Sequence, residues 1–163
     1  VQPPKTSVHM AIAPTKNMDR FEWFLEKATE LGIHKITPIL CERSERKQLK
    51  LERCNKIIAS ALKQSLRVYA PILEPLTPLN DLNTVAPIIC MAHCEEVEKI
   101  ALKKALTNQL KSCILIGPEG DFTPDEIAWA KENNIIEVHL GDARLRTETA
   151  ALVALHTALL INS

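Results

Sequence analysis

The sequence predicts a single α/β domain, residues 1–163, built on a mainly parallel sheet with helices on both faces. The first observation is that short apolar segments alternate with segments whose apolar residues recur at helical spacing. The second is that strands separated by helices need crossover connections, which join parallel strands. The third is that no repeat, low-complexity tract or obvious linker divides the 163 residues, a length that can bury a core of ordinary size.

Each expected element rests on its own pattern. Strands are expected where short apolar segments occur, at 7–13, 33–41, 86–93, 112–117 and 135–141. Helices are expected where helical spacing appears, at 17–32, 49–69, 95–109 and 147–160. In the first helix Phe21, Phe24 and Leu25 share a face, and Gly32 is a natural stop. Residues 70–82 carry three prolines and are expected to form an extended connection.

Composition points to a soluble, globular, cytoplasmic protein. Hydrophobic residues make up 46% of the chain and charged residues 25%. Twenty basic and twenty acidic residues give a net charge of zero, so no overall basic field indicates nucleic acid, although a local patch can still bind it. No apolar segment is long enough to cross a bilayer, and the five cysteines include no Cys-x-x-Cys pair. Both features fit a reducing compartment and no association with a membrane.

Three of the four glycines lie at two strand ends, which is where parallel α/β sheets bind ligands. After the strand at 112–117, Thr123 is expected to cap a helix, and Glu126 completes a Thr-x-x-Glu capping box. That helix start confines Gly117 and Gly120 to the gap between strand and helix. Glycines there permit a positive φ and let a ligand approach the backbone closely. A simple tight turn is the alternative.

The second strand end reads "LGDARLRTETAAL", where Gly141 ends a strand and Thr147 can cap the last helix. Arg146 lies next to that helix start. Because the N-terminal end of a helix disfavours cations, Arg146 needs another reason to be there, and an anionic substrate is one. The alternative is an ion pair between Arg146 and Glu148 or Glu119.

Other kinds of site find little support. The chain contains no G-x-G-x-x-G and no phosphate-loop motif. Cys90, His93 and Cys94 match no common zinc spacing, so no metal is expected, and Cys90 is expected in the core. No histidine is close in sequence to a candidate nucleophile, so a hydrolase triad is not supported.

"LIGPEGDFTPDEI" followed by "LGDARLRTETAAL" resembles the paired signature of the ribosomal RNA small-subunit methyltransferase E family. That family belongs to the SPOUT superfamily, uses S-adenosylmethionine and methylates N3 of a uridine in the decoding region of 16S ribosomal RNA. "KATELGIHKITPILCERSE" and the residues 63–65 also resemble family stretches, so the similarity covers nearly the whole chain. The chain departs from the family at Asp121, where a glycine is usual, and at Asp142 and Ala143 before Arg144.

The resemblance implies a SPOUT fold with a deep trefoil knot formed from about Leu115 to Leu160. It implies a homodimer with a shared active site, and full-length members also carry an N-terminal PUA-like domain that is absent from this chain. S-adenosylmethionine would lie bent in the knot, where a Cβ at Gly117 or Gly141 would intrude on it. The cofactor-binding residues implied are Leu115, Ile116, Gly117, Pro118, Glu119, Gly120, Leu140, Gly141, Leu145, Arg146 and Thr147.

Methyl transfer to N3 of uridine predicts the remaining roles. N3 must lose its proton, and the resulting anion spreads onto the two uracil oxygens, where a guanidinium would stabilise it. Arg146 is expected to do this, with Arg144 as second choice, while the base is Glu148, Glu119 or solvent. Residues expected to meet the RNA are Arg20, Arg43, Arg46, Gln64 and Arg144, for each of which a solvated surface side chain is the alternative.

Two other functions stay open at this point. One is a SPOUT methyltransferase that acts on a ribose 2′-hydroxyl or on another base. The other is a non-catalytic module that binds RNA or dimerises. The expected partners are 16S ribosomal RNA or the small ribosomal subunit and a second copy of the chain.

Overall fold

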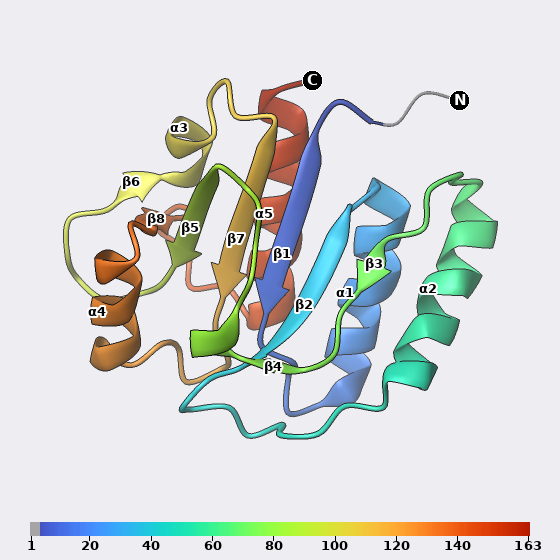
Figure 1. Ribbon diagram of the computed structural model, residues 1–163, viewed down its shortest axis with the longest axis horizontal. Coiled ribbons are helices and arrows are strands. Elements are labelled where there is room, and N and C mark those ends of the chain that lie inside the picture. Colours follow the sequence, from blue (N-terminus) through green and yellow to red (C-terminus); the bar gives the residue numbers. More distant parts are fainter. Residues whose placement is uncertain (1–3) are drawn as a thin grey trace.

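A parallel sheet with helices on both faces forms the protein, as the sequence predicts (Figure 1). The computed structural model describes residues 4–163. Its strands are β1 (Ser7–Ile12), β2 (Lys35–Leu40), β3 (Ile72–Leu73), β4 (Thr77–Pro78), β5 (Ile88–Ala92), β6 (Ile100–Ala101), β7 (Lys111–Ile116) and β8 (Ile136–His139). Its helices are α1 (Met18–Leu31), α2 (Leu51–Ser65), the 3-10 turn η1 (Leu79–Asp81), α3 (Leu102–Ala105), α4 (Pro124–Glu132) and α5 (Thr147–Ile161).

The strand order brings distant parts of the chain together at the carboxyl ends of the strands. The order is β3-β2-β1-β7-β5-β8-β6, with β4 paired to β2 off this path. The described pairings are all parallel, and β1 lies against β7 from Ser7 opposite Lys111 to Ile12 opposite Ile116. Because the strands point the same way, the carboxyl ends of β1, β7, β5 and β8 lie beside one another at one edge.

Two hydrophobic clusters cover the two faces of the sheet. Met10 and Ile114 belong to the larger cluster, which α1, α2 and α5 cover, whereas Ala11 and Leu115 belong to the smaller cluster under α4. The central strands are buried on both faces, which is why they read as continuous apolar segments. The prediction that Cys90 is a core residue is confirmed, and burial raises the pKa of its thiol to about 12.

The predicted helix over 95–109 is wrong. Only α3 is helical there, and Ile100 and Ala101 instead form the edge strand β6, paired with Val138 and His139 of β8. Leu102 and Leu106 are buried, but Val97 is 52% exposed, so only one turn of the helical pattern faces the core. The backbone gains its hydrogen bonds from the sheet edge, and tertiary pairing therefore overrides the local spacing.

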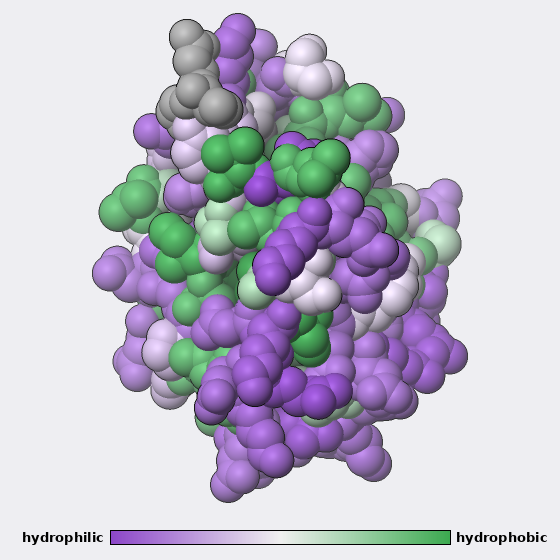
Figure 2. All heavy atoms as spheres, turned by 90° about the vertical axis from the view of Figure 1, so that its right-hand side faces the viewer, coloured by the Kyte–Doolittle hydropathy of each residue, from purple (hydrophilic) through white to green (hydrophobic). Residues whose placement is uncertain are grey.

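The other elements lie close to their predicted places, with differences around α2. This helix ends at Ser65 rather than near Tyr69, because Leu66 takes a left-handed conformation with φ 57° and is 87% exposed. Figure 2 shows the face that carries α2, where hydrophobic side chains gather in the upper half by the C-terminal end of that helix. The connection over 70–82 is extended as predicted as far as Pro78, where it adds β3 and β4 beside β2, but it ends in the 3-10 turn η1.

The predicted trefoil knot concerns the path of the chain from about Leu115 to Leu160. The strand order places β8 between β5 and β6, so the chain returns across elements formed earlier. The threading itself stays a prediction. Within residues 4–163, no helix is long and apolar enough to cross a membrane.

A chain of hydroxyl groups fixes which ring nitrogen of the buried His9 carries the proton. Nε2 of His9 lies 2.6 Å from the hydroxyl of Thr37, and that hydroxyl donates its own proton to the carboxylate of Glu74. Thr37 can therefore only accept from His9, so Nε2 carries the proton and Nδ1 accepts from Thr84 at 3.1 Å. Burial, with help from the nearby charge of Lys35, lowers the pKa of His9 to about 4.

This lowered pKa predicts acid sensitivity. Below the ordinary His pKa of 6.5 the unfolded chain binds a proton that folded His9 takes up only near pH 4. The free energy of unfolding should therefore fall between pH 6.5 and pH 4, by about 3 kcal/mol from this residue. Urea denaturation over this range measures the fall. His9→Gln should flatten it, whereas the same change at exposed His156 should not; an equal pH dependence in the wild type and His9→Gln would contradict the assignment.

Candidate active site

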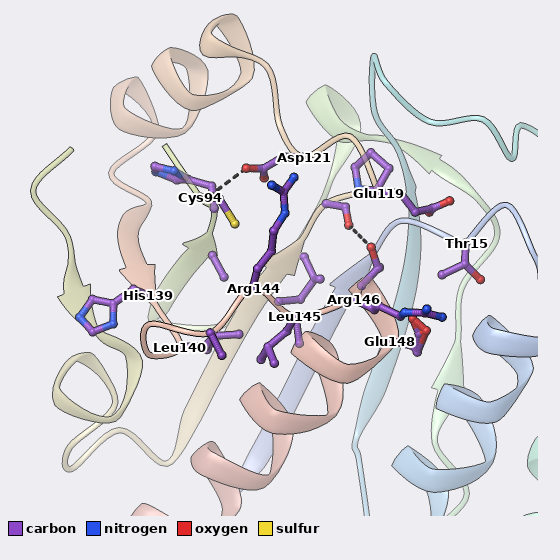
Figure 3. A pocket seen from close by; sticks show the side chains of 18 of the residues that line it. Thr15, Cys94, Glu119, Asp121, His139, Leu140, Arg144, Leu145, Arg146 and Glu148 are labelled. Carbon is purple, nitrogen blue, oxygen red and sulfur yellow. Dashed lines mark hydrogen bonds between the residues drawn. The ribbon is translucent and has the colours of Figure 1, made fainter. Parts of the chain in front are cut away.

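A cavity of about 1050 Å³ opens at the carboxyl ends of β1, β7, β5 and β8 (Figure 3). Four connections build its walls: the β1–α1 loop, the β5–β6 loop, the β7–α4 loop and the segment between β8 and α5. This is the edge at which parallel α/β sheets bind ligands, and the strand order explains why these four connections meet.

Most of the residues predicted to bind a cofactor line this cavity. They are Ile116, Gly117, Pro118, Glu119, Leu140, Gly141, Leu145, Arg146 and Thr147, and the predicted catalytic residue Glu148 lines it as well. Leu115 and Gly120 do not. Leu115 belongs to the core cluster under α4, and a Cβ on Gly120 would lie 3.3 Å from the side chain of Arg43.

A buried hydrogen bond joins the two glycine-containing loops. The hydroxyl of Thr147, the first residue of α5, donates to the carbonyl oxygen of Gly117 at 3.0 Å. The prediction that Thr147 caps α5 is therefore wrong, because the N-cap is Arg146 and no side chain caps this helix end. α5 therefore begins at the wall of the cavity with no side-chain cap on its first backbone N–H groups, and this end of a helix favours negative charge.

Two further contacts fix the β7–α4 loop from the other side. The backbone N–H of Lys16 donates to the carboxylate of Glu119 at 3.1 Å, and the guanidinium of Arg43 donates to the carbonyl of Gly120 at 2.8 Å. The capping box predicted at the start of α4 is confirmed, with Thr123 and Glu126 bonding to each other's backbone N–H. The loop is thus held at both ends and along its length.

The two loops use their glycines in different ways. In the first loop the left-handed residue is Asp121, with φ 69°, rather than Gly117 or Gly120. A Cβ at Gly117 would lie 3.1 Å from the ring of Phe122, so a larger residue there would press on this buried ring. Gly141 does take a positive φ, of 113°, and a Cβ there would meet only open space.

Arg146 and Glu148 lie beside each other at the start of α5 without forming an ion pair. Within the described part of the chain, the guanidinium of Arg146 makes no ion pair with Glu148 or Glu119, so the structural alternative to a ligand role is not seen. Arg146 is exposed, whereas Glu148 is 6% exposed and lines the cavity. Figure 3 shows both side chains on the side of the cavity near Thr15.

The predicted RNA-contacting residues separate into three groups. Arg20 and Arg144 line the cavity, and Figure 3 shows Arg144 extending across it. Arg43 and Arg46 each donate to a loop carbonyl, that of Gly120 and that of Lys16, so both help to hold the walls. Gln64 is exposed near the C-terminal end of α2. That helix end lies at the level of the amino ends of the strands, whereas the cavity is at their carboxyl ends (Figure 1).

Two walls of the cavity were not found from the sequence. The β1–α1 loop contributes Thr15 and Asn17, and the β5–β6 loop contributes His93, Cys94 and Lys99. Both loops follow buried strands, which is the available signal, but neither contains a glycine. Among residues 4–163, no group of three or more His, Cys, Asp and Glu side chains is placed to hold a metal ion.

Comparison with known proteins identifies the family to which this domain belongs. The model of the RNA methyltransferase domain family matches residues 2–159. Ribosomal RNA small subunit methyltransferase E of Rickettsia conorii is 31% identical over an alignment of 163 positions, which covers 98% of this chain and 66% of that protein. The chain therefore spans just under two thirds of the length of this relative.

Two solved structures are also similar. A probable rRNA-methyltransferase from Porphyromonas gingivalis has a TM-score of 0.90 and 37% identity, over 100% of this chain and 72% of that one. A ribosomal RNA small subunit methyltransferase E from Neisseria gonorrhoeae, bound to S-adenosyl methionine, has a TM-score of 0.80 and 28% identity, over 93% of this chain and 64% of that one. The predicted fold class is confirmed, and the chain belongs to the RNA methyltransferase domain family.

Proposed function

We propose that the cavity binds S-adenosylmethionine and that the chain methylates N3 of a uridine in 16S ribosomal RNA. The observation that carries this proposal is the joining of the Gly117 and Gly141 loops around one cavity, with Arg146 and Glu148 on its wall. The Neisseria structure supports it, because that protein carries S-adenosyl methionine. The relatives are named as ribosomal RNA small subunit methyltransferases, which supports methylation of ribosomal RNA, and the choice of N3 of a uridine rests on the family resemblance of the two loop motifs.

The cavity fits the proposed cofactor. Its volume of about 1050 Å³ is at the upper end of the ~300–1,000 Å³ found for small-molecule sites, which leaves room for a nucleotide beside the cofactor. Ile116, Leu140 and Leu145 supply apolar walls, and the loop backbone supplies polar groups. When bound, S-adenosylmethionine supplies a methyl group carried on a positively charged sulfur.

Two side chains of the cavity wall take different roles toward the uridine, one in removing a proton and one in stabilising negative charge. We assign Glu148 as the general base. The carboxylate of Glu119 already accepts a hydrogen bond from the backbone N–H of Lys16, whereas the carboxylate of Glu148 accepts none from the described residues. Glu148 takes the N3 proton. Arg146 stabilises the negative charge that spreads onto the uracil oxygens, together with the uncapped N–H groups of α5.

We further propose that the chain works as a homodimer in the cytoplasm, where its ribosomal substrate is found. α5 supports the homodimer, because it is buried along Ala151, Ala154 and Ala158 yet leaves Val153 and Leu160 38% and 62% exposed. These apolar side chains form a surface that a second copy can cover. Arg20 and Arg144 are the residues that we assign to RNA phosphates.

Mapping the methylated nucleotide tests the function most directly. Ribosomal RNA from a strain lacking the gene should lose one N3-methyluridine, and the full-length gene should restore it. Methylation that is lost instead from a ribose hydroxyl or from another base would replace this proposal by another RNA methyltransferase activity. Unchanged RNA, with no binding of S-adenosylmethionine to the purified chain, would favour a non-catalytic module.

Removing the Thr147 hydroxyl should loosen the site. Thr147→Val keeps the shape of the side chain but leaves the buried carbonyl of Gly117 without its partner, which should lower the free energy of unfolding by about 1–3 kcal/mol. Calorimetric titration should show weaker binding of S-adenosylmethionine. Thr147→Ser should restore both properties. Thr157→Val is the matched control on the same helix, since Thr157 only donates to the exposed turn below it; an equal effect at both positions would contradict the role of Thr147.

Exchanging the guanidinium of Arg146 should slow the reaction selectively. Arg146→Lys keeps the charge but loses the planar two-donor fork, so kcat should fall on the order of 10²-fold. The affinity for S-adenosylmethionine should change little, because the donor acts in the transition state. Arg67→Lys is the control, because Arg67 donates to the carbonyl of Glu30 at the C-terminal end of α1 and does not line the cavity. A parallel loss of affinity and rate in Arg146→Lys would make Arg146 a cofactor ligand instead.

A further inference from the structure

Asp121 joins two loops that face each other across one end of the cavity. Its Oδ2 accepts a hydrogen bond of 2.9 Å from the backbone N–H of Cys94, the bond drawn as a dashed line in Figure 3. Its Oδ1 accepts from the backbone N–H of Phe122 at 2.8 Å. One carboxylate therefore bonds to the β5–β6 loop and to the β7–α4 loop at once, and both Asp121 and Cys94 line the cavity.

The backbone of Asp121 is held in an unusual conformation. Its φ of 69° lies in the left-handed region, which glycine adopts freely and aspartate adopts at some cost. Its N–H closes a turn onto the carbonyl of Pro118 at 2.8 Å. A glycine would make the same turn without that cost, so the aspartate side chain needs a reason of its own. Its two hydrogen bonds supply one.

The β5–β6 loop has a second anchor on its other side. Nε2 of His93 lies 2.8 Å from Oε1 of Glu137 in β8, and Nδ1 accepts from the N–H of Glu95 at 3.1 Å. Lys99 closes the loop by donating to the carbonyl of His93 at 2.6 Å. The loop thus has few apolar contacts to fix it and depends on polar bonds, with Asp121 as its link to the β7–α4 loop.

We propose that Asp121 is a positioning residue, which holds the β5–β6 loop in place as one wall of the cavity and so raises the affinity for the cofactor. This inference rests on the proposed function. Asp121 has no part in proton transfer or in stabilising the uridine anion, so it acts on cofactor binding and not on the methyl-transfer rate. Its bond to Cys94 is exposed, so water can replace it at small cost to folding.

The test is Asp121→Gly, which removes both carboxylate bonds and keeps the left-handed turn without strain. Calorimetry should show S-adenosylmethionine binding about tenfold more weakly, whereas the melting temperature should change little. With ribosomal subunits as substrate, KM for the cofactor should rise and kcat at saturating cofactor should be unchanged. Asp121→Asn tolerates the turn and keeps one amide oxygen as acceptor, so it should recover part of the affinity.

Asn134→Gly is the matched control. Asn134 is also left-handed, with φ 59°, but it is exposed and does not line the cavity. The Asn134→Gly variant should show the effect of the glycine substitution on stability alone, with unchanged affinity for S-adenosylmethionine. Equal affinity in Asp121→Gly and the wild type, or a fall in kcat without a change in affinity, would overturn the inference. If the wild type itself binds no S-adenosylmethionine, it is the proposed function that fails.

Discussion

The hydrogen bond between the hydroxyl of Thr147 and the carbonyl of Gly117 is the constraint on which the site depends. It ties the start of α5 to the end of the central strand β7, two segments that are 30 residues apart. Because the bond is buried and the carbonyl has little access to water, its geometry is enforced by the cost of leaving either group unpaired. The cavity lies between the loops that this bond holds together.

The placement of β7 in the middle of the sheet gives this bond its effect. β7 pairs with β1 on one side and β5 on the other, so the loop that follows it borders the loops that follow both neighbours. Glu119 reaches the β1–α1 loop and Asp121 reaches the β5–β6 loop. The polar side chains of the β7–α4 loop are therefore used to hold its neighbours, which is why we propose that Arg146 and Glu148 at the start of α5 are the residues that act on the substrate.

Local patterns predicted the parts of this site that depend on local physics. The capping box of Thr123 and Glu126 fixed the start of α4, and strand ends rich in glycine indicated the two loops correctly. The partner of Thr147 could not be predicted, because a hydroxyl at a helix start bonds its own backbone unless the fold offers a carbonyl nearby. The segment 95–101 was predicted as part of a helix because its apolar spacing is helical. Its last two residues form β6 instead, and the pairing of β6 with β8 depends on a strand order that no local pattern contains. Because the strand order cannot be read from the sequence, the cavity walls formed by Thr15 and Cys94 were not predicted either.

A crystal structure of the chain grown with S-adenosylhomocysteine, the product form of the proposed cofactor, tests the central claim most directly. We expect the adenosyl group to lie between the Gly117 and Leu140 segments, with the Thr147–Gly117 bond intact and the sulfur directed toward the side of the cavity that holds Arg146 and Glu148. A ligand bound elsewhere, such as the smaller cavity of about 320 Å³ beside Trp129, or a Gly117 carbonyl that turns away from Thr147 to admit it, would contradict the account.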